Sequence, residues 1–427
     1  MVSMNELKQD MITGMGYIGL DSGRLYRMRR GPKLIEAVAS GTTIIINDAT
    51  EGRPFRGLRV FGKSTQDGAP TPEAPVPIVS AGESGNIAVE VGGKNLLTGR
   101  LYFTNYSNGI PHVYNEDEVA LPYAPSSETH GIGYVVPCKP GVQYTFSVTN
   151  PNKNWYLGIA EYENFEQAKS FLNKIGFQQG TEKSSIKYTA VGNGVLVCAI
   201  AGKWTDGKTT THECTESELL QLEIGSEATT YEPYRAPQTL TLQIPNGLPG
   251  VPVSEDGNYT DADGQQWICD EIDLERGKYV QRVAIEKNNG GWELKPSSDT
   301  PGRFFQHNKL TNIFSIALKK SLCNIASFTS WGAPVNDKYA FALNGHGIYF
   351  SPPKGAEITA EELNAKLNSL SFPVVFVGEL ATPIERDLTP EEIAAYKALR
   401  TYGPTTVVSN DAGAEMEVTY VADRKEN

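Results

Sequence analysis

The sequence predicts a mainly β protein in which one long β-rich stretch, residues 92–236, interrupts a β scaffold. Three observations support this prediction. Glycine and proline are abundant, with 42 and 26 residues, as in chains of short strands and tight turns. Apolar and polar residues alternate in many short segments. The segments on either side of the stretch, 87–91 and 239–244, both alternate in this way and can pair with each other.

Length and charge limit the classes of protein. A chain of 427 residues fits about two to four domains. A net charge of −12 argues against a nucleic-acid surface and favours solubility. Residues 1–19 lack the apolar run of a signal peptide, and no segment has the roughly 20 apolar residues that span a bilayer. We therefore expect synthesis in a cytoplasm and no membrane insertion.

The cysteines predict buried, reduced thiols rather than a disulfide framework. They are scattered, odd in number and without Cys-x-x-Cys spacing. They are Cys138, Cys198, Cys214, Cys269 and Cys323.

The inserted stretch contains clear strand patterns. Residues 142–149 alternate with a period of two, which predicts a half-buried strand. Residues 194–200 are continuously apolar and predict a strand covered on both faces. Residues 163–175 contain helix formers with apolar side chains along one side, and we expect a short helix there.

The scaffold segments contain further strands and two helix starts. Four prolines within residues 67–77 predict an extended crossing over the surface. Residues 256–267 predict a hairpin. Thr359 with Glu362, and Thr389 with Glu392, have the spacing of capping boxes that begin short helices.

No group of residues has the spacing of a catalytic, nucleotide or metal site. A zinc site needs three or four convergent ligands, and the five histidines provide no such set. Gly-x-Ser-x-Gly and Walker A motifs are missing. The acidic pairs Asp270–Glu271 and Glu161–Glu163 lie in patterns typical of a solvated face. We therefore predict no enzyme activity, no cofactor and no metal.

The loop at residues 256–263 is acidic. Its oxygen-bearing side chains are candidate Ca²⁺ ligands, but the EF-hand spacing and the closing glutamate are missing. A turn rich in Asx residues is the simpler interpretation. The residues are Asp256, Asn258, Asp261 and Asp263.

Aromatic residues in predicted loops of the inserted stretch are the candidate binding residues. Sugars stack their CH faces on flat rings, and polar side chains nearby can bind the hydroxyl groups. The alternative is that the same rings pack in the core and at its rim. The candidates for glycan binding are Trp155, Tyr156, Trp204, Tyr106 and Tyr114.

Several motifs resemble those of minor tail and tail-fibre proteins of tailed bacteriophages and prophages of Gram-positive gut bacteria. Residues 62–68 with the following prolines resemble the leading segment of these proteins. Lys94-Asn95-Leu96-Leu97 and residues 222–234 resemble the ends of their jelly-roll, carbohydrate-binding-like module. Residues 263–273 and 379–383 are similar to a following hairpin and a late strand. The resemblance covers residues 50 to 423, and its motifs are architectural rather than catalytic.

The resemblance implies a β-rich virion protein of the tail, assembled with other tail proteins as a homo-oligomer, with a trimer favoured. It implies host attachment, which we interpret as recognition of a cell-surface glycan. Two alternatives stay open: a purely structural tail or baseplate subunit, and a surface-polysaccharide depolymerase. No long fibrous shaft is visible, which favours a compact tip or baseplate over a fibre.

These considerations give a domain plan. We expect a discontinuous β-sandwich scaffold, a jelly roll, a small α+β unit, few short helices, and terminal segments that attach to neighbouring subunits. The expected ranges are 51–91 with 237–285 and 371–388 for the scaffold, 92–236 for the jelly roll, 286–370 for the α+β unit, and 1–50 and 389–427 for the terminal segments.

Overall fold

The structure is a computed structural model of the full chain. The prediction of a mainly β protein is confirmed. The structure describes residues 17–19, 25–27, 33–97, 100–104, 112–115, 130–149, 155–170, 173–181, 183–202, 204–205, 208–209, 220–288, 291–295, 304–307, 314–315, 321–328, 337–344, 347–353, 355–356, 358–403 and 405–424.

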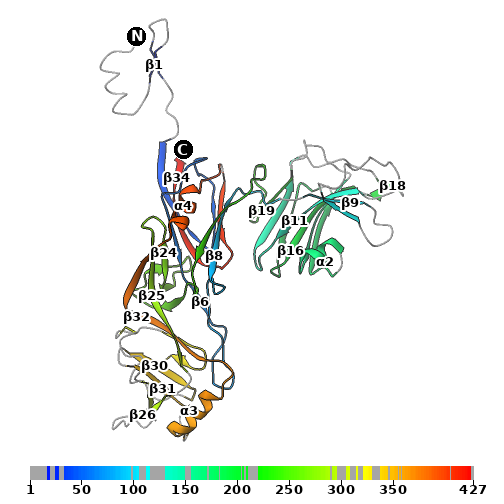
Figure 1. The fold of residues 1–427 in the computed structure, drawn as a ribbon. Coiled ribbons are helices and arrows are strands. Elements are labelled where there is room, and N and C mark those ends of the chain that lie inside the picture. Colours follow the sequence, from blue (N-terminus) through cyan, green and yellow to red (C-terminus); the bar gives the residue numbers. More distant parts are fainter. Residues whose placement is uncertain are drawn as a thin grey trace. The chain divides into compact units, whose positions relative to one another are not determined.

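The chain divides into two compact units (Figure 1). The first, here called the scaffold unit, comprises Met1–Val91 and Gln238–Asn427. The second, the inserted unit, comprises Gly92–Pro237 and ends one residue beyond the range expected from the sequence. The two units have separate hydrophobic clusters.

A seven-stranded sheet is the largest element of the scaffold unit. Its last long strand, β34, lies between β5 and β3, so both terminal segments contribute to the sheet. Segments 1–50 and 389–427 therefore supply strands that complete this unit, and their expected attachment to neighbouring subunits stays a prediction. In spatial order the strands are β28 (Leu322–Cys323), β32 (Val374–Asp387), β25 (Lys278–Asn288), β24 (Glu271–Asp273), β5 (Gly57–Phe61), β34 (Glu415–Arg424) and β3 (Lys33–Gly41).

A four-stranded sheet shares a core with this large sheet. Alternate residues of both sheets point into one cluster, among them Val89 and Leu240 from one sheet and Leu58 and Met416 from the other. The period-two alternation in the sequence arises from this arrangement. The strands in spatial order are β20 (Gln238–Gln243), β8 (Asn86–Gly92), β33 (Thr406–Asn410) and β4 (Thr43–Ile46).

Smaller sheets complete the scaffold unit. The hairpin predicted at 256–267 is present, because Tyr259 of β22 pairs with Trp267 of β23. The strands are β21 (Gly250–Val253), β23 (Gln266–Cys269) and β22 (Tyr259–Thr260) in one sheet, β26 (Glu293–Lys295), β27 (Phe304–His307), β31 (Gly347–Ser351), β30 (Ala340–Asn344) and β29 (Ser327–Phe328) in another, and the pairs β6 (Ser64–Thr65) with β7 (Val79–Ser80) and β1 (Tyr17–Gly19) with β2 (Leu25–Arg27).

The segment expected as a small α+β unit does not have a core of its own. Its cluster around Phe341 and Phe350 includes Ala284 of β25 and Val374 and Phe376 of β32. These strands belong to the seven-stranded sheet, so the segment packs as an extension of that sheet.

The inserted unit has two larger sheets and one small pair. Residues of both larger sheets, including Phe146, Leu157, Leu196 and Leu222, form its main cluster. The strands are β10 (His112–Asn115), β9 (Arg100–Thr104), β11 (His130–Pro137), β16 (Val195–Gly202), β13 (Trp155–Tyr162) and β14 (Gly176–Thr181) in the first sheet, β15 (Ser185–Thr189), β12 (Gln143–Val148) and β19 (Leu220–Ile224) in the second, and the pair β17 (Trp204–Thr205) with β18 (Lys208–Thr209).

The described helices are short: α2 (Phe165–Ser170), α3 (Ala360–Asn368) and α4 (Pro390–Ala398). Both predicted capping boxes are confirmed, since Thr359 and Thr389 each exchange two hydrogen bonds with the glutamate three residues later. Helix α2 lies within the expected range 163–175, and residues 171–172 lie outside the described residues.

The two ends of the inserted unit are joined by buried polar side chains. Asn95 donates from Nδ2 to the carbonyl oxygens of Leu220 and Glu232, at 3.2 and 2.9 Å. Its Oδ1 accepts from the N–H groups of Leu97 and Leu222, at 3.2 and 3.3 Å. All four hydrogen-bonding positions of this amide are therefore used. Asn95 ties the start of the unit to its last strand.

Neighbouring side chains extend this connection. Lys94 pairs with Glu232 at 3.1 Å and donates to the Thr229 hydroxyl at 2.7 Å. Glu223 accepts from both the N–H and the hydroxyl of Thr229. The motifs at 94–97 and 222–234 therefore meet in one network, which explains in physical terms why both need polar residues at buried positions.

We predict that Asn95→Ala destabilises the inserted unit by about 2–4 kcal/mol, because it leaves buried N–H and carbonyl groups without partners. Hydrogen exchange of the β19 amides in the full chain measures this loss as faster exchange. Gln178→Ala, which removes an exposed amide of the same unit, is the control and should leave β19 protected. Unchanged β19 protection in Asn95→Ala would contradict the role assigned to this residue.

Candidate functional site

The predicted glycan-binding residues lie on several strands of the inserted unit. Trp155 and Tyr156 begin β13, Trp204 begins β17, and Tyr114 lies in β10. Tyr106 lies outside the described residues. For these residues the structure gives the position of the backbone, which is in strands and not in the loops expected from the sequence.

The sheet order separates two of these candidates. Strands β9, β11 and β16 lie between β10 and β13. Four strand spacings of about 4.8 Å separate Tyr114 from the level of Tyr156, on the order of 19 Å measured along the sheet. A shared glycan site for Tyr114, Trp155 and Tyr156 stays a prediction.

An exposed apolar patch on β14 was missed in the sequence. We define the apolar patch as Ile175 and Phe177, which are 44 and 48 % exposed and two residues apart. The Phe177 ring lies against Gly158 of the adjacent strand, where a Cβ would be in ordinary van der Waals contact with it, at 3.6 Å. The Lys174 ammonium lies 4.8 Å from the centre of the ring. The signal in the sequence was a lone phenylalanine between glycines, in Gly176-Phe177-Gln178-Gln179-Gly180.

The patch lies beside the part of β13 that carries two predicted residues. Phe177 pairs with Ala160, which is four residues along β13 from Tyr156. At about 3.3 Å per residue the two backbone positions are roughly 13 Å apart, a span of two to three sugar rings. An exposed ring bordered by polar side chains provides a stacking surface for a flat apolar face.

Glu161, Asp270 and Glu271 are buried, so the expectation of a solvated face is wrong for these three residues, whereas Glu163 is exposed as expected. Glu161 is fully buried and accepts hydrogen bonds from the Tyr188 hydroxyl and from the N–H groups of Val191 and Gly192, at 2.7, 2.9 and 2.6 Å. It fixes the turn between β15 and β16. The sequence pattern could not predict this role, because the groups that donate hydrogen bonds to Glu161 lie about 30 residues away along the chain.

Glu271 is also buried and pairs with two cations of the scaffold unit. Arg59 contacts its Oε1 and Arg282 contacts its Oε2 at 2.9 Å. Arg59 also pairs with Glu417 at 3.3 Å. These carboxylates cross-link β5, β24, β25 and β34 on the face opposite the main core.

Asp270 supports an irregularity in the seven-stranded sheet. The register of β25 and β32 shifts between Gln281 and Val283, where residues 380–383 of β32 lie opposite Arg282 alone. The Asp270 carboxylate accepts from the N–H groups of Arg282 and Val283, each at 2.8 Å, and from the Tyr279 hydroxyl at 2.6 Å. It thus supplies partners to N–H groups at the interruption of the ladder.

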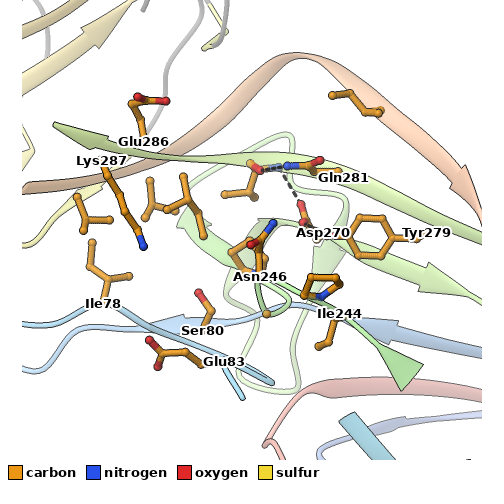
Figure 2. A pocket seen from close by; sticks show the side chains of 18 of the residues that line it. Ile78, Ser80, Glu83, Ile244, Asn246, Asp270, Tyr279, Gln281, Glu286 and Lys287 are labelled. Carbon is orange, nitrogen blue, oxygen red and sulfur yellow. Dashed lines mark hydrogen bonds between the residues drawn. The ribbon is translucent and has the colours of Figure 1, made fainter. Parts of the chain in front are cut away.

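Asp270 also lines a cavity of about 830 Å³ in the scaffold unit. Figure 2 shows Asp270, Tyr279 and Gln281 at one end and Ile78, Glu286 and Lys287 at the other. Residues of β25 and of β32 line one side of it, and residues within 78–83 and 244–249 line the other. Apolar, acidic and basic side chains all line the cavity. This mixture selects no single class of ligand.

Burial raises the pKa of Asp270 to about 6, although its three hydrogen-bond donors and Arg282 act in the opposite direction. Desolvation of the carboxylate is the largest cause. The group therefore changes its charge close to neutral pH, while its hydrogen bonds are made to backbone and tyrosine groups of the same sheet.

The acidic loop at 256–263 forms a turn, as its simpler interpretation predicted. Asp261 accepts from the N–H groups of Asp263 and Gln265 and from the Trp267 indole. Asn258 accepts from the Cys269 N–H. Among the described residues, no group of three or more metal-binding side chains is present.

Two further features concern cysteines and helices. Cys138, Cys198, Cys269 and Cys323 are buried free thiols, and Cys214 lies outside the described residues. In the described part of the chain no helix has the length and apolar character needed to span a membrane.

Comparisons with known proteins found no matching protein family, no similar curated protein and no similar solved structure.

We predict that Asp270→Asn removes a pH dependence of stability. The folded-state pKa of about 6 exceeds the ordinary value of 3.8, so the folded protein holds a proton between these pH values that the unfolded chain releases. This contribution stabilises the wild type below about pH 4 and is lost as the pH rises through 6, a change of about 3 kcal/mol. Denaturant titrations at pH 4 to 7.5 should show Asp270→Asn gaining stability relative to the wild type over this range.

A second variant tests the assigned cause. Tyr279→Phe removes one hydrogen-bond donor that lowers the pKa of Asp270. The pH at which the stabilising contribution of Asp270 is fully lost should therefore rise. Parallel pH profiles for the wild type and Asp270→Asn would contradict the assignment.

Proposed function

We propose that this chain is a structural protein of a bacteriophage tail that takes part in host attachment by recognising a cell-surface glycan through its inserted unit. The motifs at 62–68, 94–97 and 222–234 support the tail assignment by resemblance. The observation that carries the glycan assignment is the exposed Phe177 ring, seated against Gly158 on a sheet of the inserted unit.

The separate core of the inserted unit supports a recognition role. Its main cluster draws on two sheets and is closed by Asn95 and Lys94 at the ends. This arrangement fits a jelly-roll, carbohydrate-binding-like module, and the shared core of the two large scaffold sheets fits a β-sandwich. A module with its own core can vary its surface without disturbing the scaffold.

The partners follow from this proposal. They are a glycan of the Gram-positive cell surface and the other proteins of the tail, with the chain itself present in several copies in the virion. The depolymerase alternative finds less support, because Glu161, Asp270 and Glu271 bind groups of their own unit. The alternative of a purely structural subunit, which would not bind a glycan, is tested by measuring binding to cell walls.

Replacing Gly92–Pro237 by Asn-Gly should abolish binding of the chain to purified Gram-positive cell walls while the scaffold still folds. Val91 and Gln238 are paired residues of antiparallel strands, so a two-residue turn can join them as a hairpin. Co-sedimentation with cell walls measures binding, and circular dichroism checks the fold. Undiminished binding by the shortened, folded chain would place recognition outside the inserted unit.

Phe177→Ala tests the ring itself. Loss of one stacking contact should weaken adsorption to cell-wall polysaccharide about 10-fold or more, without a change in melting temperature, because the ring is half exposed. Val79→Ala is the matched control: it removes an apolar side chain that is also 48 % exposed, in the scaffold unit. Equal adsorption by both variants would exclude Phe177 from the binding surface.

A further inference from the structure

Strand β3 is a long, open edge of the seven-stranded sheet. Its nine residues pair with β34 on one side, and no other strand of the described chain pairs with its second side. In Figure 1 it is the blue strand beside β34. Its outer face exposes Val38 and Leu34, with exposed fractions of 61 and 44 %. The segment contains neither proline nor a bulge, two of the usual protections of an edge, and its charged residues are Lys33 at its first position and Glu36.

The opposite edge of the same sheet is covered. The short strand β28 and the residue after it receive hydrogen bonds from the proline-rich crossing: Gln66 donates to the Cys323 carbonyl at 2.8 Å, and the Val76 N–H donates to the Asn324 carbonyl at 2.8 Å. The crossing at 67–77 therefore occupies backbone groups that would otherwise form an open edge.

The outer edge of the four-stranded sheet at β20 is covered as well. Glu392 of α4 accepts from the Gln243 N–H at 2.9 Å. The Gln238 side chain exchanges two hydrogen bonds with the backbone of Arg400, each at 3.0 Å. Since the chain protects these edges, the exposed apolar edge at β3 indicates a surface that a partner covers.

The hydrogen-bonding direction of β3 follows from its neighbour. Thr419 and Val421 of β34 accept from Arg56 and Thr50 on the side of β5. The alternate residues of β34, such as Tyr420 and Ala422, therefore face β3 and bond its odd-numbered residues. The N–H and carbonyl groups that point away from the sheet belong to Leu34, Glu36, Val38 and Ser40.

We propose that β3 pairs with β3 of a second copy of this chain, antiparallel about a two-fold axis at Ala37. This register pairs all nine residues, because Ala37 is the midpoint of Lys33–Gly41. It places Glu36 opposite Val38 and Leu34 opposite Ser40. The four outward residues of each copy then use all their backbone donors, and Val38 lies diagonally opposite Val38 and Leu34 of the other copy.

Charge favours the register with its axis at Ala37 over the register with its axis at Glu36. An axis at Glu36 would place two carboxylates directly opposite each other, which is destabilising. A second copy of this chain can cover the edge without any other kind of protein. Its own β3 presents outward N–H and carbonyl groups with the same spacing, so the two edges can pair with each other by symmetry. The resulting pair differs from the trimer that the tail-protein resemblance implies, and it stands independently of glycan recognition.

Sedimentation of the full chain tests the proposal. We expect a dimer at micromolar concentration, and we expect Val38→Lys to raise the dimer dissociation constant by at least 10-fold because it places a charge in the apolar edge. Val191→Lys, in an exposed turn of the inserted unit, is the control and should remain dimeric. Ala37→Cys should give a disulfide-linked dimer under mild oxidation, because residues of a non-hydrogen-bonded pair have Cα atoms about 4.5 Å apart.

Other outcomes overturn the proposal. A monomeric wild type would exclude self-pairing, and dimerisation only after removal of residues 1–30 would show that the chain's own N-terminal segment covers β3. A trimer insensitive to Val38→Lys would assign assembly to another surface. Cross-linking of the wild type to the same extent as Ala37→Cys would remove the support for the register.

Discussion

The antiparallel pairing of β8 with β20 is the constraint on which the two-unit organisation depends. The last pair of this ladder joins Val91 to Gln238, so the chain leaves the scaffold and returns to it at one point. A segment whose two ends meet can fold around its own core without opening the sheet that carries it. Asn95 and Lys94 then close the inserted unit immediately after that point, which keeps its first and last segments together.

Buried polar side chains satisfy backbone groups at three places in the described chain where regular strand pairing ends or shifts. Asp270 binds two N–H groups where β25 and β32 lose register, and Glu161 binds two in the turn after β15. Asn95 does the same between the two ends of the inserted unit. In each case one side chain meets the hydrogen-bonding needs that a regular strand would have met, which allows the sheets to turn or shift without unpaired backbone groups.

The sequence contains the parts of the fold that depend on local periodicity. Alternation at 87–91 and 239–244 predicts half-buried strands, and both are present and paired. The capping boxes at Thr359 and Thr389 are recognisable because all their atoms lie within four residues. The burial of Glu161 and Asp270 was not predictable, because it depends on donors and on sheet faces that other segments supply. The exposure of Phe177 was missed for the same reason, since it depends on the position of β14 at the edge of its sheet.

The exposed apolar residues fall into places with different physical consequences. Phe177 lies on an edge strand of the inserted unit, whereas Val38 and Leu34 lie on an edge strand of the scaffold unit. An exposed ring offers a flat face, which suits a small apolar surface such as that of a sugar. An open strand offers directional N–H and carbonyl groups along its length, which suits another strand. Because the two units have separate cores, a change at one of these surfaces leaves the packing behind the other unaltered.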